Sequence, residues 1–564
     1  MKKYLFIALA ALGFAACAEK LDDNSPVHNG ELEESYIAIN LMSADVDTRA
    51  ATDSYGYEEG TTAERAVKSA YFFFFDENGN PFNVTGAPAT APDPTQNGKN
   101  YLSLTISNAS KTGMPNVSDI KEAVLVLKTY KGIYPKQLVA VLNWTPENRE
   151  YTLAELHTVV ANSIGNDTDG YVMSNSVYMD SNNKMVDATP IAEANIKSTS
   201  EEAVATPIQI YVERTAAKVV LTATGKIEDT ENIFKVTDDD EFVPVGGSGI
   251  TVYMQLQGWE LFNDYNSSSL LKNINTTWDP TALGLTWNDI AYYRCYWAQS
   301  QSTDPDDEFS WKYTDNRFPT EYGFAVGSNT YCGENTNLVE STYNTKVILK
   351  GQLKQKNGTS YEPLEVTSWY GNQYVGVENL KIAVANSLKY TLYYYDEINS
   401  KYVSIRPEHL QCIAGASIGA KAYEVGFALT SDVTRYTWYQ YSSTEGHQPF
   451  GDVSIDGDNA AKANEYLATV EPALLYTEGQ TYYYLDIEHL GQNGKPAQYG
   501  VVRNHVYQID INSIKGYGSP VYSSNDFIIE YPEYPEDEDD GSYVAAKINI
   551  LSWKVVKQGV DIVQ

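Results

Sequence analysis

Basic residues are scarce in this chain. Its 564 residues include 40 Lys and Arg against 74 Asp and Glu, which gives a formal net charge of -34 at pH 7. Binding to nucleic acid depends on clustered Lys and Arg that pair with phosphates. The composition therefore excludes nucleic acid as a partner, and the acidity instead favours a soluble, exposed surface.

Cysteine and histidine are also rare, with 4 and 6 residues. Cys17 lies in the N-terminal leader, which leaves Cys295, Cys332 and Cys412, an odd number for a disulfide framework. A bridge between Cys295 and Cys332 and free buried thiols are both open. The histidines show no HExxH motif or other ligand spacing. We expect no metal, no cofactor and no catalytic residue.

The apolar run at the N-terminus is too short to span a bilayer, because it covers only residues 4–16 and a membrane helix needs about 20 residues. With Lys2 and Lys3 before it, this run is typical of a signal peptide. Ala15-Ala16-Cys17 resembles a bacterial lipobox. We therefore predict a lipoprotein signal peptide at residues 1–17, with Cys17 acylated (palmitate); an ordinary signal peptide is the alternative.

Tyrosine is abundant, with 45 residues, and Tyr, Val, Ile and Thr gather in short runs between Asn, Asp, Gly and Ser. This pattern favours strands, and the length favours more than one domain. We predict a mostly β chain, with an N-terminal β-sandwich domain at 50–225 and a C-terminal one at 226–530. Strands are expected at 70–76, 123–127, 137–143, 207–221, 250–256, 346–349, 390–395, 480–487 and 505–511, and a short helix at 153–160.

The C-terminal stretch, residues 543–563, is rich in Val, Ile, Tyr and Trp and alternates apolar with polar residues around Ile548 and Ile550. Its alternation changes parity near Ser552, which predicts two strand segments joined by a bulge or kink. An acidic spacer with two prolines, residues 531–541, precedes it. Like charges and proline disfavour packing of this spacer on the domain before it. A tethered strand of this kind is an aggregation hazard unless a partner sheet receives it.

A similar segment lies near the N-terminus, where Ile39-Asn40-Leu41-Met42-Ser43 echoes Ile548-Asn549-Ile550-Leu551-Ser552. One segment can therefore replace the other in a groove; two ordinary edge strands are the alternative. Downstream of the first segment, Arg49 precedes Ala50 in a polar stretch, and an exposed Arg-Ala bond is a natural protease site. We predict a propeptide at residues 18–49 that is cut after Arg49.

The chain resembles the fimbrillins, the major shaft subunits of type V pili of Gram-negative bacteria, and within them the short-fimbria major-subunit branch. The resemblance covers nearly the whole chain. Besides the lipobox and the Arg49-Ala50 bond, it rests on seven segments: Val139-Ala140-Val141-Leu142-Asn143, Met173-Ser174-Asn175-Ser176-Val177-Tyr178, Tyr211-Val212-Glu213-Arg214, Tyr331-Cys332-Gly333-Glu334-Asn335-Thr336, Val501-Val502-Arg503-Asn504-His505-Val506-Tyr507, Ser552-Trp553-Lys554-Val555 and Val560-Asp561-Ile562.

The resemblance implies two transthyretin-like β-sandwich domains in tandem, delivery to the outer membrane, and removal of the leading strand by an arginine-specific protease. It also implies a cell-surface fimbrium: a homopolymer formed by donor-strand exchange, with accessory anchor and tip proteins and with host or bacterial surface ligands.

In such a polymer, Ile37, Ile39 and Leu41 belong to the displaced strand. The acidic tether and donor strand of another subunit, residues 531–564, supply the side chains that enter the same groove: Ala546, Ile548, Ile550, Trp553, Val555, Val560 and Ile562. Main-chain pairing gives affinity, and alternate side chains give register. In the uncleaved chain we expect the leading strand to be paired in a sheet and the C-terminal strand to be poorly packed or extended.

Two other functions compete with this one. A surface-exposed glycan-binding or adhesin lipoprotein that does not polymerise would stack Trp259, Trp297 or Trp369 on sugars, although large aromatic residues in sandwiches are usually core. A secreted enzyme would use Ser417, which lies in a G-x-S-x-G pattern. That pattern needs a strand before it and a helix after it in an α/β-hydrolase fold, so a glycine-flanked turn is the simpler interpretation.

The lipobox generates the first testable prediction. Replacing Cys17 with serine removes the thiol that would be acylated, so Cys17→Ser should abolish lipid attachment and leave the chain periplasmic or soluble. Metabolic labelling with a fatty acid and membrane fractionation measure this. Unchanged labelling and fractionation of the variant would refute the lipobox assignment.

Overall fold

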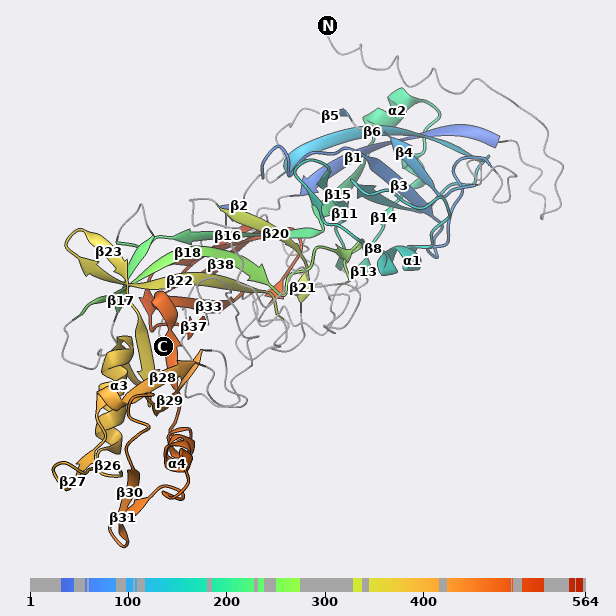
Figure 1. The fold of residues 1–564 in the computed structure, drawn as a ribbon. Coiled ribbons are helices and arrows are strands. Elements are labelled where there is room, and N and C mark those ends of the chain that lie inside the picture. The colour runs from blue at the N-terminus through green and yellow to red at the C-terminus, as the bar shows by residue number, and fades with distance from the viewer. Residues whose placement is uncertain are drawn as a thin grey trace.

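A computed structural model describes most of the chain: residues 32–44, 56–57, 60–87, 98–104, 107–108, 117–179, 185–227, 232–237, 250–273, 328–336, 344–414, 423–487, 489, 500–521, 547–552 and 554–560. Strands dominate these residues (Figure 1), which confirms the mostly β prediction. The tandem transthyretin-like arrangement and the domain limits at 50–225 and 226–530 stay predictions. No helix in the described residues is long and apolar enough to cross a membrane.

A nine-stranded sheet forms the N-terminal unit. Its strand order is β4 (Tyr101–Leu104), β3 (Ala70–Phe75), β7 (Gln137–Leu142), β11 (Met173–Asn175), β15 (Ile208–Arg214), β1 (Leu32–Ala44), β6 (Val117–Tyr130) and β5 (Ser107–Asn108), with β14 (Thr189–Pro190) beside β7. The short pairs β9 (Gly165–Asn166) with β10 (Gly170–Tyr171) and β12 (Tyr178–Met179) with β13 (Met185–Val186) lie outside it. The strands expected at 70–76, 123–127 and 137–143 are confirmed.

Both faces of this sheet are covered. Phe72 and Phe74 of β3 lie in one core, and Phe73 and Phe75 lie in another on the opposite face. A strand that is buried on both sides needs a continuous apolar run instead of alternation, which explains the four successive phenylalanines. The second core includes Leu156 of α1 (Leu153–Thr158), a helix that begins in a capping box and matches the expected one.

The chain passes from the first unit to the second without a loop, because β16 (Ala216–Ala223) follows β15 after a single residue. The strand expected at 207–221 is thus divided between two sheets. The second sheet has the order β2 (Gly56–Tyr57), β39 (Lys554–Val560), β38 (Lys547–Ser552), β35 (His505–Ile511), β16 and β20 (Asn329–Gly333).

A seven-stranded sheet faces it across a shared core. Its order is β36 (Ile514–Lys515), β17 (Ile233–Thr237), β18 (Val252–Phe262), β22 (Lys346–Asn357), β33 (Gln480–Asp486) and β37 (Ser519–Pro520), with β23 (Ser360–Pro363) beside β22. Leu221 and Ile509 from one sheet share the core with Leu256 and Leu349 from the other. The strands expected at 250–256, 346–349 and 480–487 lie in this sheet, and the strand expected at 505–511 lies in the second sheet.

A third unit lies between β22 and β33 in the sequence, where the sequence analysis placed no separate core, and we call its own hydrophobic core the third-unit core. A five-stranded sheet, β25 (Asn372–Val375), β24 (Val366–Trp369), β32 (Ala473–Tyr476), β29 (Glu424–Leu429) and β28 (Leu410–Ala414), surrounds it with α3 (Gly376–Leu388) and α4 (Asp458–Leu467). A four-stranded sheet follows: β27 (Lys401–Ser404), β26 (Leu392–Asp396), β30 (Trp438–Ser442) and β31 (Gly446–Pro449). These elements project away from the nine-stranded sheet (Figure 1).

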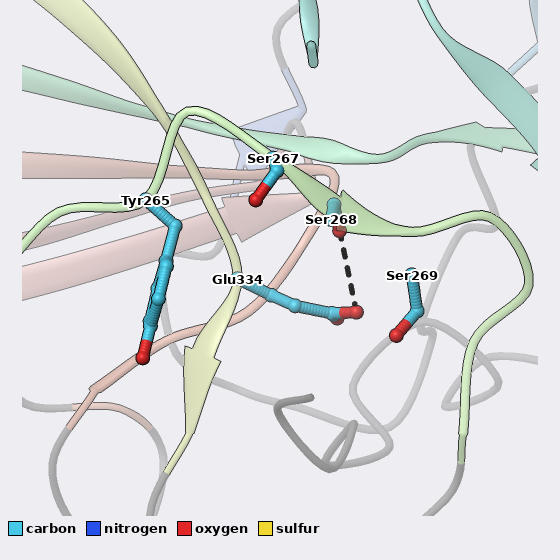
Figure 2. A pocket seen from close by; sticks show the side chains of 5 residues that line it. All are labelled: Tyr265, Ser267, Ser268, Ser269 and Glu334. Carbon is cyan, nitrogen blue, oxygen red and sulfur yellow. Dashed lines mark hydrogen bonds between the residues drawn. The ribbon is translucent and has the colours of Figure 1, made fainter. Parts of the chain in front are cut away.

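The first two units meet at a polar junction. The segment after β18 crosses to the N-terminal unit, where β19 (Ser268–Ser269) pairs with β8 (Val160–Ala161) and Leu270 and Leu271 enter the core beside Phe73. Nearby, β21 (Asn335–Thr336) pairs with β34 (Gly500–Val501). Tyr265, Ser267, Ser268, Ser269 and Glu334 line a cavity of about 10 Å³ (Figure 2), which is room for one water molecule at most. The junction is therefore closely packed.

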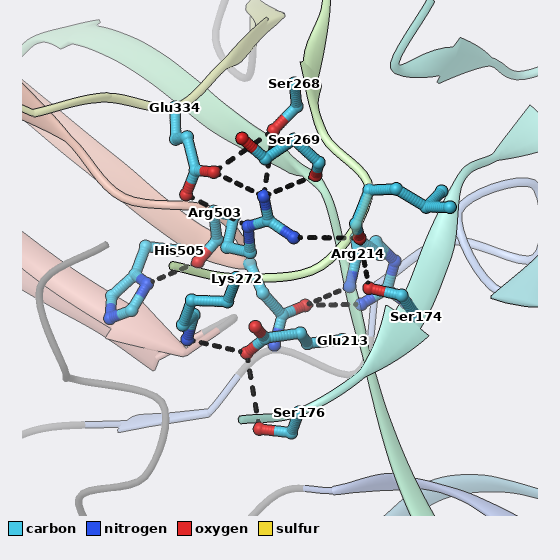
Figure 3. A network of polar contacts seen from close by, with 12 residues as sticks. Ser174, Ser176, Glu213, Arg214, Ser268, Ser269, Lys272, Glu334, Arg503 and His505 are labelled. Carbon is cyan, nitrogen blue, oxygen red and sulfur yellow. Dashed lines mark hydrogen bonds and ion pairs between the residues drawn. The ribbon is translucent and has the colours of Figure 1, made fainter. Parts of the chain in front are cut away.

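Arg503 is the centre of this junction. Its side chain is fully buried, and its guanidinium donates to both carboxylate oxygens of Glu334, with 2.9 Å between Nε and Oε2. It also donates to the carbonyl oxygens of Ser269 and Leu270 and to the Ser268 hydroxyl (Figure 3). Burial alone would lower the pKa of Arg503, but the Glu334 carboxylate raises it, so the guanidinium stays charged.

A second buried ion pair lies next to it. Lys272 Nζ is 2.9 Å from Glu213 Oε2, and neither side chain is exposed. Arg214, the next residue of β15, donates to Asn504 Oδ1 at 3.2 Å and to the Glu64 carbonyl at 2.7 Å. The junction thus collects polar residues from four of the segments that carried the fimbrillin resemblance: those at 173–178, 211–214, 331–336 and 501–507.

Glu64 ties a turn of the N-terminal unit to the second sheet. Its side chain is fully buried, pairs with Lys218 of β16 at 2.9 Å and accepts a hydrogen bond from Tyr331 of β20. Burial alone would raise the pKa of the Glu64 carboxyl, but the hydrogen bonds from Tyr331 and Lys218 outweigh it and lower the pKa. Burial, together with the hydrogen bond to Glu64, raises the pKa of Tyr331 far above its ordinary value.

The buried Glu64 carboxylate generates a stability prediction. Glu64→Gln removes the buried carboxylate that pairs with Lys218, so it should lower the free energy of unfolding at pH 7 by about 3–5 kcal/mol. Because the folded pKa of Glu64 is lowered, its contribution is present above the usual value of about 4.3 and is lost as the pH falls through the folded pKa. The difference between wild type and variant should therefore shrink below about pH 4.3.

Urea unfolding at a series of pH values measures this difference. The matched control is Glu34→Gln, because Glu34 pairs with Lys128 at 3.4 Å but is 53% exposed. That change should cost no more than about 1 kcal/mol. Equal losses for the two variants would contradict the role of the buried pair.

Candidate functional site

The leading strand β1 lies inside the nine-stranded sheet and not at its edge. On one side it runs parallel to β15, with Ile39 opposite Ile208 and Ser43 opposite Val212. On the other side it runs antiparallel to β6 along nearly its whole length, from Leu32 opposite Tyr130 to Ala44 opposite Val117. The expectation that the leading strand is paired in a sheet is confirmed.

Ile37 and Ile39 of β1 point into the core. Both are 0% exposed and share a cluster with Leu125 of β6, Ile210 of β15 and Phe72 of β3. The walls of this slot, β6 and β15, carry their apolar residues on alternate positions, as strands that face a core do. The slot occupied by β1 is therefore apolar inside and lined by backbone hydrogen-bonding groups on both sides.

Polar contacts hold the start of β1 at the surface. The Tyr36 amide donates to the Lys197 carbonyl at 2.8 Å, and the Lys197 amide donates to the Tyr36 carbonyl at 3.0 Å. Glu33 accepts hydrogen bonds from the Tyr134 hydroxyl at 2.5 Å and from the Gly132 amide at 3.3 Å. The bond from Tyr134 lowers the pKa of the Glu33 carboxyl. These contacts fix the register of β1 at one end of the slot.

The C-terminal stretch is paired within its own chain, so the expectation of a poorly packed or extended strand is wrong. It forms two strands, β38 and β39, in an antiparallel hairpin in which Ile548 lies opposite Lys557. β39 then runs parallel to β35, from Val555 opposite Val506 to Val560 opposite Ile511. The reason is that β16 covers only one side of β35, and the other side needs partners for its backbone groups.

The two strands of this hairpin are held unequally. β39 has partners in β35, β38 and β2. In the described ladders β38 pairs with β35 at one position, Ser552 opposite His505, and its other pairs are all to β39. The two predicted segments with a break near Ser552 are confirmed, but the break reverses the chain direction instead of kinking one strand.

The predicted site residues fall into three groups. Ile37 and Ile39 lie in the slot, and Leu41 is opposite Ile210 in the parallel ladder. Ile548 and Ile550 lie in β38, and Val555 and Val560 lie in β39. The remaining ones lie outside the described residues: Cys17, Arg49, Ala50, Ala546, Trp553 and Ile562.

The residues considered for sugar binding, catalysis or disulfide formation either are buried in the fold or lie outside the described residues. Trp259 and Trp369 are buried in two different cores, whereas Trp297, Cys295 and Ser417 lie outside the described part. Burial raises the pKa of the Cys412 thiol to about 11, which disfavours a reactive thiolate. In the described ranges, no group of three or more His, Cys, Asp or Glu residues is arranged to hold a metal ion.

Sequence reasoning missed the residues that wall the slot. The alternation of Ile208, Ile210 and Val212 in β15 and of Ala123, Leu125 and Leu127 in β6 marks core-facing strands. That signal is visible in the sequence, but it does not say which two strands flank β1. The segments that build the polar junction are recognisable in the sequence, but nothing in the sequence shows that they come together in one cluster.

Residues 474–559 match the family described as "Major fimbrial subunit protein type IV, Fimbrillin, C-terminal". This stretch contains β33, β35, the hairpin of β38 and β39, and Arg503 at the centre of the junction. No curated protein matches the chain in sequence.

Three solved structures illustrate what the chain resembles. A fimbrilin from Porphyromonas gingivalis W83 is 10% identical, covers 94% of this chain and 98% of its own, and has a TM-score of 0.35. A putative cell adhesion protein from Parabacteroides distasonis ATCC 8503 gives the same identity and coverages with a TM-score of 0.36. The tip fimbrial protein Mfa3 from Porphyromonas gingivalis is 12% identical over 85% of this chain and 95% of its own, with a TM-score of 0.25.

The match at residues 474–559 spans the elements that join the C-terminal hairpin to the rest of the molecule. Residues 474–559 are thus similar to the C-terminal region of the fimbrillins.

Proposed function

We propose that this chain is the structural subunit of a cell-surface fimbria and that it polymerises by donor-strand exchange after proteolysis. The observation that carries the proposal is the position of β1. A strand at the start of the chain fills the interior of a sheet, and a candidate cleavage site, Arg49-Ala50, follows it in the sequence. The protein then acts as a building element and not as an enzyme.

Removal of β1 has a predictable physical cost. β6 and β15 each lose a backbone partner, and unpaired strand edges attract other strands. Exposing Ile37 and Ile39, which are both fully buried, costs about 3–6 kcal/mol in total. While β1 is in place the slot is closed, so the uncleaved subunit cannot accept another strand. After cleavage the leading segment is held by non-covalent contacts alone and is replaceable.

The donor is β38 of a neighbouring subunit. Its Ile548-Asn549-Ile550 repeats the apolar, polar, apolar order of Ile39-Asn40-Leu41, so the isoleucines enter the slot at the spacing that β1 uses. Within the described residues β38 has β39 as its main partner, and its release breaks few backbone pairs. In the donated state Ile548 would take the place of Ile39 opposite Ile208, and Ile550 would take that of Leu41.

The surroundings of the subunit follow from this scheme. An arginine-specific protease supplies the cleavage, Cys17 anchors the precursor in the outer membrane, and anchor and tip proteins begin and end the homopolymer. Host or bacterial surface ligands bind the finished fimbria. The competing function is a glycan-binding or adhesin lipoprotein that does not polymerise. It does not explain why β1 lies inside the sheet or why β1 and β38 have similar sequences.

Cleavage should control assembly. Arg49→Ala removes the protease site, so the variant should stay monomeric when wild-type protein, treated with an arginine-specific protease, forms filaments. Electron microscopy and size-exclusion chromatography measure this. Arg149→Ala is the control, because Arg149 is a partly exposed arginine elsewhere in the chain and its loss should leave assembly unchanged. Filaments of Arg49→Ala at the normal rate would rule out gating by cleavage.

The donor strand should be separable from the fold. Replacing Ile548 and Ile550 with aspartate puts two charges into an apolar slot, at a cost of several kcal/mol, and should stop elongation while the monomer stays folded. The matched control is Val453→Asp with Ile455→Asp, which adds the same charge at positions that are 58% and 57% exposed and should permit assembly.

A synthetic peptide of residues 543–563 tests the shared slot directly. It should bind cleaved subunits and cap them, and it should not bind the uncleaved precursor, in which β1 fills the slot. Isothermal titration calorimetry compares the two forms. Equal binding to both forms would contradict the shared slot but would leave the fold assignment unaffected.

A further inference from the structure

The four-stranded sheet of β27, β26, β30 and β31 has one covered face and one aromatic face. On the covered face, Leu392 and Trp438 are fully buried in the third-unit core. Strand alternation sends the neighbouring side chains to the opposite face. Six rings gather there from all four strands: Tyr393, Tyr395, Tyr402, Tyr439, Tyr441 and His447. We call these six residues the aromatic face.

The rings of the aromatic face form one continuous group. Tyr402 and His447 come from the two outer strands and stack over the inner ones, with ring centroids 3.8 Å apart and planes 3° from parallel. Tyr393 contacts His447 edge-on at 4.7 Å, and Tyr439 contacts Tyr402 at 5.0 Å. Tyr402 and Tyr441 are 40% and 39% exposed. The rings therefore form one outward-facing cluster, in which Tyr402 and His447 are parallel and their neighbours Tyr393 and Tyr439 are set edge-on. We call this cluster the platform.

The phenol hydroxyls of this platform are unused by the protein. Among the residues that the structure describes, the hydroxyl groups of Tyr393, Tyr395, Tyr402, Tyr439 and Tyr441 have no hydrogen-bond partner. None of them is a buried unsatisfied atom either, so they reach solvent. Each hydroxyl can both donate and accept a hydrogen bond. The platform thus combines aromatic surface with hydroxyl groups that have no partner in the described part of the protein.

Hairpin stability explains only part of this arrangement. Cross-strand aromatic pairs stabilise a sheet, and Tyr395 opposite Tyr402 is such a pair. Stability alone does not require that every strand contribute a ring to the same exposed face. A contiguous exposed aromatic patch marks a binding surface, and tyrosine suits this role because it offers a rigid, amphipathic surface at low entropic cost.

Charge and shape narrow the ligand class. Bases of nucleic acids stack on such rings, but their phosphates need a basic surface, and the chain carries a formal net charge of -34. The same argument disfavours sulfated or sialylated glycans. Proline-rich peptides bind in aromatic-lined grooves, whereas this platform is the flat face of a sheet. A neutral sugar has C–H faces that stack on rings and hydroxyl groups that pair with phenols.

We propose that the aromatic face binds neutral oligosaccharides, with the sugar rings stacked on Tyr402 and Tyr441 and the sugar hydroxyls bonded to the free phenols. The face lies far from β1 and its slot (Figure 1). The site therefore does not depend on filament assembly, and it would remain accessible if the slot of the same subunit were filled by a donor strand.

The experiment uses the full-length, uncleaved monomer, so its outcome is independent of polymerisation. Isothermal titration calorimetry measures binding of chitohexaose, cellohexaose and maltoheptaose, with heparin and a polyproline peptide as contrasting ligands. Wild-type protein should bind at least one of the neutral oligosaccharides and neither contrasting ligand. Tyr402→Ala and Tyr441→Ala should each weaken the binding at least tenfold, and Tyr402→Phe, which keeps the ring, should weaken it less.

The control is Tyr390→Ala, because Tyr390 is 68% exposed but lies outside the aromatic face; it should bind like wild type. Circular dichroism verifies folding, and Tyr402→Leu and Tyr441→Leu replace any alanine variant that unfolds, since leucine keeps apolar volume without a flat ring. The proposal is overturned by absence of binding to all three oligosaccharides in the millimolar range, by preference for heparin or polyproline, or by unchanged affinity of the Tyr402 and Tyr441 variants.

Discussion

Arg503 and Glu334 carry opposite charges in a place from which water is excluded, and the relation between the first two units depends on this pair. Moving an ion out of water costs several kcal/mol, which is offset only when geometry is good and the remaining donors find acceptors. Arg503 meets that condition through the carbonyls of Ser269 and Leu270. The segments around 268–272, 334 and 503 must therefore pack together in the folded protein. If one of them were displaced, a buried charge would lose its ion-pair partner.

This requirement reaches the slot through a single strand. β15 lines the slot, carries Glu213 and Arg214 at its end, and continues into β16 of the second sheet after one residue. Since Glu213 is paired with Lys272, and Arg214 with Asn504, the wall of the slot cannot shift along its axis without breaking buried polar contacts. The junction thus supplies a rigid wall against which a strand of fixed register can pair.

Sequence reasoning works best where a physical pattern is local. The four phenylalanines of β3, the capped helix that starts at Leu153, and the alternation along β35 are all visible in short windows. The echo between 39–43 and 548–552 likewise needs only the sequence. The structure places the first of these segments in an interior strand, which the pattern alone does not specify.

What could not be predicted depends on long-range partners. Lys272 and Glu213 are 59 residues apart, and Arg503 and Glu334 are 169 apart, so no local signal reveals that they pair. The hairpin of β38 and β39 was missed for a related reason. An amphipathic strand has the same sequence pattern whether it pairs with its own chain or with another chain. The third-unit core was missed although Ala460, Ala463 and Leu467 of α4 follow helical spacing, because tyrosine-rich strands surround that helix in the sequence.

The two neighbours of β1 run in opposite directions, with β15 parallel to it and β6 antiparallel. Turning a strand end for end in this slot would exchange the two hydrogen-bond patterns, and neither ladder would then fit. The slot is therefore a directional socket. If it receives the C-terminal strand of another copy, the contact is head-to-tail and does not close on itself. Each added subunit must then point the same way as the last, and the two ends of the resulting fibre must differ chemically, one with an open socket and the other with an undelivered strand.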